Sequence, residues 1–323
     1  MPIENKMNNI MLGTWGLAGQ NKISNLSLGW PIIENNVISD ILDRALKENI
    51  KWIEMSDFYG KGFIEQFVGN KFKNNRENIK YATKGGIIPK FTDNYGQLKK
   101  DFSPEYLNRA LNKSLNNLQT DYLDLYQLHG ANLNTLKKQE LQVFLQELKT
   151  KNKVRSIGVS IGSKNVIQNL EAISQYDFID YVQLSYSIDN PKMIYAINNW
   201  KEKYLGNLNL IGRSIFLHGL FTKETPSLIR NLDDHRSRKY SNKLIEKVIK
   251  FKNIVNEEFS MTLKDAILLF SINNKNINSV VIGATQKKYI TEWSLLLKEK
   301  QINKDFSNNF LKIANEVFTD ESI

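Results

Sequence analysis

Trp52-Ile53-Glu54-Met55-Ser56-Asp57-Phe58-Tyr59-Gly60 is a short apolar run that ends in a tyrosine followed by glycine. Two later segments end in a similar way, 79–86 at Lys84 and 122–130 at His129. The carboxyl ends of neighbouring parallel strands meet at one edge of a sheet, so we expect these three side chains to converge. A convergence of reactive side chains favours an enzyme over a binding scaffold.

Working outward, strand-like and helical patterns alternate along the whole chain. The predicted strands are 10–15, 51–54, 79–83, 122–128, 153–159, 179–184, 208–213 and 278–282. The predicted helices include 105–117, 138–150, 163–173, 192–203 and 262–273. This alternation indicates parallel βαβ units. Right-handed crossovers repeated eight times close into a (β/α)₈ TIM barrel, an α/β fold that we predict as a single domain over 1–323.

An open doubly wound sheet is the competing arrangement. Its phosphate-binding fingerprint is missing, because Gly13-Thr14-Trp15-Gly16 does not match G-x-G-x-x-G. Two segments stand outside the repeat. Residues 222–240 are long, polar and basic, and we interpret them as a flap over the site, with a plain surface loop as the alternative. Residues 305–317 are predicted to form a last helix outside the barrel.

The composition excludes several classes of protein. The 323 residues contain 41% hydrophobic residues and no cysteine, so disulfides, thiolate chemistry and cysteine metal sites are absent. No run of about 18 apolar residues exists, which argues against a membrane helix. The net charge of +10 is spread over helix faces without a basic, aromatic-rich stripe. We therefore expect a cytoplasmic protein that acts on a small molecule, without nucleic-acid or membrane partners.

In this order, the motifs closely resemble those of the aldo-keto reductases, from about Met11 to Trp293. The main signature is an acidic residue, four further residues and Tyr-Gly, here Glu54 to Tyr59-Gly60. Lys84 and His129 match the ends of the third-strand and fourth-strand motifs, and 154–160 and 182–183 match those of the fifth and sixth strands. The resemblance implies a (β/α)₈ barrel that transfers a hydride between a nicotinamide cofactor and a carbonyl or alcohol.

The chemistry explains these residue types. Carbonyl reduction needs a proton at oxygen, and a free tyrosine with a pKa of about 10 is a poor acid or base at neutral pH. As the general acid/base, Tyr59 would have its pKa lowered by the ammonium of Lys84. Glu54 would keep Lys84 charged, and His129 would orient the carbonyl. The hydride comes from the cofactor.

Cofactor contacts follow from the same resemblance. Nicotinamide contacts are predicted for Gly13, Thr14, Ser160 and Gln183; Arg213, Ser214 and Leu220 follow near the pyrophosphate; and Gly283, Thr285, Lys287, Lys288 and Glu292 form the adenosine end. Binding of the cofactor's 2′-phosphate by Lys287 or Lys288 would favour NADPH, with NADH as the alternative. The three histidines are widely separated, so we predict no metal.

Four positions depart from the family pattern. Glu54 stands where aspartate is usual, Ile161 replaces a common asparagine, Arg213 replaces a frequent aromatic residue, and Trp293 replaces an asparagine near the adenine. Because about 1 Å of misplacement can cost about a hundredfold in rate, these changes bear on efficiency and cofactor geometry. They leave the fold prediction unchanged.

Two further functions stay open at this point. A barrel that binds nicotinamide nucleotide with little turnover would be a redox sensor or scaffold subunit. A glycoside hydrolase would use Glu54 and Asp57 as its paired carboxylates, although their i, i+3 spacing suits a glycosidic bond poorly. Arg213 and the basic flap favour a polar or anionic carbonyl substrate, such as a sugar derivative.

Overall fold

The computed structural model describes residues 6–23, 26–91, 98–204, 206–232, 236 and 239–320. Eight parallel strands close into a barrel in the order β1-β12-β11-β10-β9-β8-β5-β4, and β4 pairs back with β1. The barrel strands are β1 (Ile10–Gly13), β4 (Trp52–Glu54), β5 (Lys80–Gly85), β8 (Leu125–His129), β9 (Ile157–Ser160), β10 (Tyr181–Ser185), β11 (Asn209–Arg213) and β12 (Ser279–Gly283). The predicted (β/α)₈ barrel is confirmed, and each predicted strand overlaps one of these eight.

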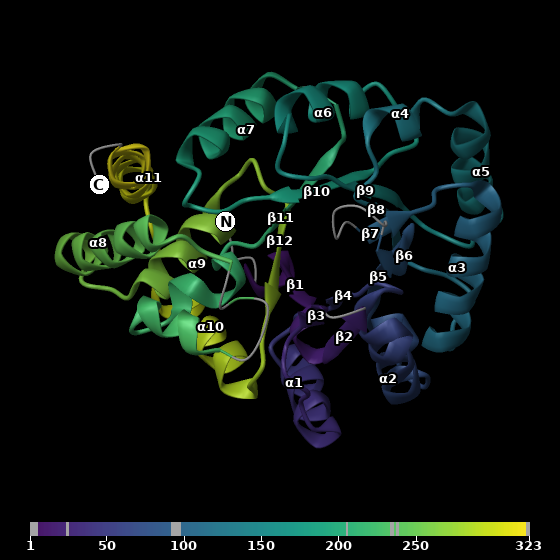
Figure 1. The fold of residues 1–323 in the computed structure, drawn as a ribbon, viewed down its shortest axis with the longest axis horizontal. Helices are drawn as coiled ribbons and strands as arrows, with labels where there is room; N and C mark the ends of the chain where they lie inside the picture. Colours follow the sequence, from purple (N-terminus) through teal and green to yellow (C-terminus); the bar gives the residue numbers. More distant parts are fainter. Residues whose placement is uncertain are drawn as a thin grey trace.

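Helices surround the barrel (Figure 1). They are α1 (Asn35–Lys47), α2 (Phe63–Phe72), α3 (Pro104–Leu118), α4 (Leu133–Leu136), α5 (Gln139–Thr150), α6 (Val166–Ile173), α7 (Pro191–Lys203), α8 (Asn242–Phe259), α9 (Leu263–Asn273), α10 (Lys287–Glu299) and α11 (Lys304–Thr319). Helix α3 begins as its sequence predicts: the Oγ of Ser103 accepts a hydrogen bond from the Tyr106 amide, and Pro104 follows at the first position. No helix in the described part of the chain is long and apolar enough to cross a membrane.

Most of the core lies between the barrel and its helices. The apolar faces of α1 and α3 bury residues at helical spacing, for example Ile38, Ile41, Leu42 and Ala45 of α1. A smaller apolar cluster of Met11, Ala82, Leu125 and Ile211 comes from the barrel strands β1, β5, β8 and β11. Because all eight strands run in the same direction, their carboxyl ends lie at the same end of the barrel. Side chains at these strand ends therefore lie close to one another.

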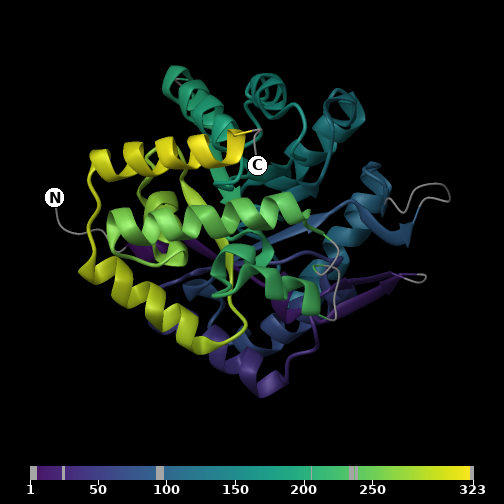
Figure 2. The same ribbon diagram turned by 60° about the vertical axis from the view of Figure 1, so that its left-hand side comes forward.

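Two antiparallel hairpins were absent from the sequence predictions. They are β2 (Gln20–Ile23) with β3 (Leu26–Gly29), and β6 (Ile87–Phe91) with β7 (Leu98–Lys100). Both extend from the same end of the barrel (Figure 2). They follow β1 and β5, so they border the edge at which the candidate site residues lie.

The two segments outside the repeat differ in structure. The loop at 222–240 contains the 3₁₀ helix η6 (Pro226–Asn231), while 233–235, 237 and 238 lie outside the described residues. The helix expected at 305–317 corresponds to α11, which runs beside α8 (Figure 2). Its Phe310 and Phe318 pack against Phe251 of α8, so the α11 helix covers the outside of the barrel.

Candidate active site

The side chains of Glu54, Lys84 and Tyr59 meet at the carboxyl ends of β4 and β5. The Lys84 ammonium forms an ion pair with Glu54 and donates hydrogen bonds to the Tyr59 hydroxyl at 3.2 Å and to the Met55 carbonyl at 2.8 Å. The side chains of the ion pair are only 1% and 4% exposed. Since a buried charge needs a close partner, the ion pair with Glu54 holds the Lys84 ammonium in place, directed at the Tyr59 hydroxyl.

A tight turn holds Tyr59 in this position. Gly60 and Gly62 have φ angles of 58° and 94°, in the left-handed region that glycine adopts without strain. A Cβ on Gly60 would also come 2.6 Å from the Ala18 carbonyl oxygen. The Tyr-Gly pair is therefore a structural requirement, because the chain must reverse immediately after the tyrosine and start α2.

Burial and charge act in opposite directions on the lysine and the tyrosine. Burial disfavours the Lys84 ammonium, but attraction to Glu54 and Tyr59 together with their hydrogen bonds raises the Lys84 pKa above its ordinary value. Burial also raises the pKa of Tyr59, and the Lys84 charge offsets only part of this effect. The sequence-based expectation of a lowered tyrosine pKa was wrong in its net direction, because desolvation outweighs the ammonium. Tyr59 is thus a protonated phenol at neutral pH.

His129 ends β8 and its ring lies 6.1 Å from that of Tyr59, edge to face. Burial, followed by the positive charges of Lys84, Arg213 and Lys100, holds the His129 pKa well below its ordinary value. The imidazole is therefore neutral near pH 7, with one nitrogen that donates and one that accepts.

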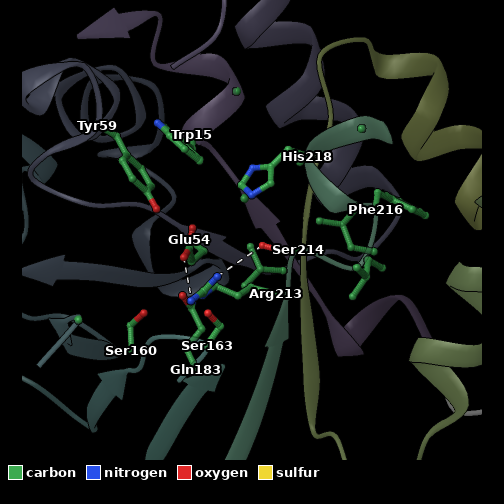
Figure 3. A pocket seen from close by; sticks show the side chains of 18 of the residues that line it. Trp15, Glu54, Tyr59, Ser160, Ser163, Gln183, Arg213, Ser214, Phe216 and His218 are labelled. Atoms are coloured by element: carbon green, nitrogen blue, oxygen red, sulfur yellow. Dashed lines mark hydrogen bonds between the residues drawn. The ribbon is translucent and has the colours of Figure 1, made fainter. Parts of the chain in front are cut away.

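Trp15, Trp30 and His218 form an aromatic wall of the site beside Tyr59. Trp15 stacks on the Tyr59 ring at 6.0 Å and meets Trp30 edge to face at 4.7 Å. The His218 ring lies 5.7 Å from that of Trp15 and 6.1 Å from that of Trp30. Figure 3 shows His218 beside Trp15. The Arg236 guanidinium lies over the Trp30 ring at 5.0 Å, so part of the predicted flap contacts this wall.

A cavity of about 1310 Å³ opens onto these groups and reaches the start of α10. Most of the predicted site residues line it: Gly13, Glu54, Tyr59, His129, Ser160, Gln183, Arg213, Ser214, Gly283, Thr285 and Glu292. Gln183 donates a hydrogen bond to Glu54 at 2.9 Å, and Arg213 donates one to the Ile161 carbonyl at 2.9 Å. Figure 3 shows Glu54, Gln183 and Arg213 close together at the floor.

The other predicted residues lie outside the lining. Thr14 is fully buried and its hydroxyl donates to the Glu54 carbonyl, while Leu220 is buried in the core. The Lys287 ammonium pairs with Asp40 of α1 at 2.6 Å, and Lys288 lies over the Tyr289 ring. These contacts do not direct either lysine toward the cavity.

Four residues that line or adjoin the cavity were not among the site residues predicted from the sequence. Lys264 is the second residue of α9 and pairs with Glu292 at 2.8 Å. Lys100 ends β7, with its ammonium 2.7 Å from the Gly130 carbonyl oxygen. Ser56 contacts His129, and Lys223 lies at the cavity edge, directly after the 3₁₀ helix η5 (Leu217–Thr222). Only the Ser-Asp pair inside the 52–60 motif offered a local signal; the lysines are indistinguishable from surface lysines without the fold.

Comparison with known proteins agrees with this geometry. The model of the Aldo/keto reductase family matches residues 9–313. The "Uncharacterized oxidoreductase YqkF" of Bacillus subtilis is 28% identical over 84% of this chain and 86% of its own length. The NADH-specific methylglyoxal reductase of Escherichia coli is 30% identical over 55% of this chain and 54% of its own.

Among solved structures, the aldo-keto reductase AKR11C1 from Bacillus halodurans superposes with a TM-score of 0.72 at 21% identity, covering 94% of this chain and 91% of the other. The glycerol dehydrogenase AKR11B4 from Gluconobacter oxydans gives 0.71 at 17% identity, with coverages of 95% and 91%. At these identities the structures support the fold alone. The match over nearly the whole chain establishes that this protein belongs to the aldo/keto reductase family of NAD(P)H-dependent oxidoreductases.

Proposed function

We propose that this protein reduces the carbonyl group of a polar small molecule with NADPH, with Tyr59 as the general acid. The observation that carries the proposal is the Lys84 ammonium, which contacts both Glu54 and the Tyr59 hydroxyl beside the cavity. A phenol that can deliver its proton while an adjacent ammonium stabilises the resulting phenolate meets the requirement of carbonyl reduction.

The cavity residues fit a nicotinamide nucleotide. The cavity volume of about 1310 Å³ exceeds the range of roughly 300–1,000 Å³ that is typical of pockets for one small ligand. The cavity therefore has room for both a dinucleotide and a substrate. Gly13 lines the floor, and a Cβ there would come 2.7 Å from the Val281 side chain. Gly13, Ser160 and Gln183 would hold the nicotinamide end, Ser214 the pyrophosphate, and Thr285 and Glu292 the adenosine. When bound, the cofactor supplies the hydride.

The side chains of this site divide the remaining work. Neutral His129 donates a hydrogen bond to the carbonyl oxygen and orients it toward Tyr59. Tyr59 then gives its proton to the developing alkoxide, and Lys84 stabilises the phenolate that remains. Because burial raises the Tyr59 pKa, the phenol stays protonated at neutral pH and can act as the acid in carbonyl reduction. Oxidation of an alcohol needs the Tyr59 phenolate instead, so the oxidation rate should rise with pH.

Nicotinamide binding and turnover can be measured on one sample. NADPH should quench the fluorescence of Trp15 and Trp30 at the cavity wall, and a mixed panel of carbonyl compounds should then cause loss of the reduced-nicotinamide absorbance. Tight binding without turnover on any carbonyl compound would favour the redox-sensor function. Failure to bind either nicotinamide nucleotide would refute the proposal.

We assign the 2′-phosphate contact to Lys264, in place of Lys287 and Lys288. Both lysines are paired with a carboxylate, but Lys264 and its partner Glu292 line the adenosine end of the cavity, whereas Lys287 and its partner Asp40 lie outside the lining. A hydrogen bond to a charged group is worth about 1.5–3 kcal/mol, so Lys264→Ala should weaken NADPH binding by roughly 10-fold or more and leave NADH binding nearly unchanged. Isothermal titration with both nucleotides measures the difference. Lys287→Ala is the matched control, and an equal loss in that variant would return the role to Lys287.

Lys100 supports an anionic substrate. Its ammonium lines the cavity one residue from His129, burial lowers its pKa, and no carboxylate pairs with it in the described part of the chain. Lys100→Met should raise KM about tenfold for carbonyl compounds that carry a carboxylate or phosphate, and should leave neutral aldehydes unaffected. Lys99→Met is the control, because the adjacent Lys99 does not line the cavity. A wild-type preference for neutral apolar aldehydes would contradict the anionic class.

A further inference from the structure

The Ser56 hydroxyl connects a carboxyl group to the imidazole of His129. Its Oγ lies 3.2 Å from Asp57 Oδ1 and 3.2 Å from His129 Nδ1, and it accepts a hydrogen bond from the Phe58 amide at 3.2 Å. The Lys84 carbonyl is a more distant acceptor at 3.5 Å. Ser56 is fully buried, so water does not compete for these contacts.

Counting hydrogens allows two arrangements. A serine hydroxyl has one hydrogen and two lone pairs, and the Phe58 amide uses one lone pair. When Asp57 is ionised it accepts the serine hydrogen, so His129 must carry its proton on Nδ1 and donate it to Oγ. When Asp57 is protonated it donates to Oγ, and the serine hydrogen turns to Nδ1. His129 then carries its proton on Nε2, the ring nitrogen for which no protein partner is found within the described residues.

The surroundings of Asp57 bring the change between these two hydrogen-bond arrangements close to neutral pH. Burial, and then the nearby Glu65 carboxyl, raise the Asp57 pKa to about 7, opposed by the Ser56 hydroxyl, the Phe58 amide and the Lys84 charge. The other ionisable groups that face Asp57 are the hydroxyls of Tyr106 on α3 and Tyr126 on β8, and the His129 imidazole. All three stay neutral near pH 7: both tyrosine pKa values are raised and that of His129 is depressed.

We propose that Asp57, acting through Ser56, is a positioning residue that sets which nitrogen of His129 carries the proton. The protonated carboxyl gives the Nε2–H form, which donates a hydrogen bond into the cavity. The ionised carboxylate gives the Nδ1–H form, which directs a lone pair at the same place. For catalysis the inference rests on the proposed carbonyl reduction: only the Nε2–H form binds a carbonyl oxygen, so reduction declines as Asp57 loses its proton.

The tautomer can be tested without any substrate. The chain has three histidines, so ¹⁵N-histidine labelling gives a simple spectrum in which His129→Gln identifies the His129 signals. From about pH 5 to about pH 9 the wild-type ring should change from Nε2–H to Nδ1–H while remaining neutral. Asp57→Asn, whose amide donates to Ser56 at every pH, should hold the Nε2–H form throughout. Asp43→Asn on the exposed face of α1 is the matched control and should behave as wild type.

Kinetics test the catalytic consequence separately. If only the protonated carboxyl supports reduction, wild-type kcat/KM should fall about tenfold between about pH 6 and about pH 8. Asp57→Asn should remove this step while keeping the rate seen at low pH. Ser56→Ala should break the connection, which makes the tautomer independent of pH and lowers kcat more than it raises KM.

Two results would overturn the proposal. One is a wild-type His129 whose tautomer is the same over the whole pH range, and the other is a change that persists in Asp57→Asn. Because the spectra come from the free protein, a tautomer change without carbonyl reduction would leave this inference standing and refute the proposed reaction alone. Circular dichroism of each variant shows that it is folded before its spectrum is interpreted.

Discussion

Tyr59→Phe is expected to abolish carbonyl reduction while leaving NADPH binding almost unchanged. Positioned acid catalysis contributes about 10²–10⁴ in rate, and the ring that stacks on Trp15 stays in place when only the hydroxyl is removed. The loss should therefore appear in kcat. Single-turnover absorbance and fluorescence titration measure the two quantities on the same variant.

Tyr186→Phe is the matched control. Tyr186 is also buried, but its hydroxyl accepts a hydrogen bond from Asn274 and its ring stacks on Phe270 of α9, away from the cavity lining. This variant should retain nearly all turnover. If Tyr59→Phe kept a rate close to that of Tyr186→Phe, another group would have to supply the proton, and the assignment of the general acid would be wrong.

Lys84→Met should impair both stability and activity, for two separable reasons. Removing one member of a buried ion pair costs about 3–5 kcal/mol, because the Glu54 carboxylate is left uncompensated in the barrel. Removing a charge that stabilises the transition state should also lower kcat by about 10²–10³. Denaturant unfolding and steady-state kinetics report the two effects.

A double variant separates the two effects. Lys84→Met with Glu54→Gln removes both charges, so much of the lost unfolding free energy should return while turnover stays low. Lys247→Met is the control for burial: Lys247 is 7% exposed and donates to the carbonyls of Phe318 and Asp320 at the end of α11. It should lose stability and keep kcat. Full activity in the double variant would exclude Lys84 from the chemistry.

The barrel was predictable because its pattern is local. Each barrel strand is a short apolar run between helical segments, and a helical period is recognisable over ten or more residues without any knowledge of contacts. The hairpins β2–β3 and β6–β7 were missed because their strands are short and were not among the predicted strands. Helix α10 was not among the predicted helices, and its first residues, Lys287 and Lys288, were assigned to the adenosine end of the cofactor.

The site was only partly predictable. Lys84 and His129 lie at the ends of β5 and β8, and Tyr59 lies in the turn that follows β4; the closed barrel brings these three strand ends to one edge. The direction of a long surface side chain depends on what the fold places nearby, and this explains the outcome for Lys287, which meets Asp40 across 247 residues of sequence. The net shift of the Tyr59 pKa was also inaccessible, because desolvation depends on complete burial and not on the neighbouring residue types.

By itself the sequence determined the eight-fold alternation and the family, since both depend on residue types at short, fixed spacings. It also supplied the candidate catalytic residues, whose roles stay a prediction. The tertiary structure alone decided which cations face the cavity, that Trp15, Trp30 and His218 form one wall, and that Ser56 links Asp57 to His129. These last features join side chains from separate strands and loops. Their distances are set by barrel closure and burial, which no local pattern encodes.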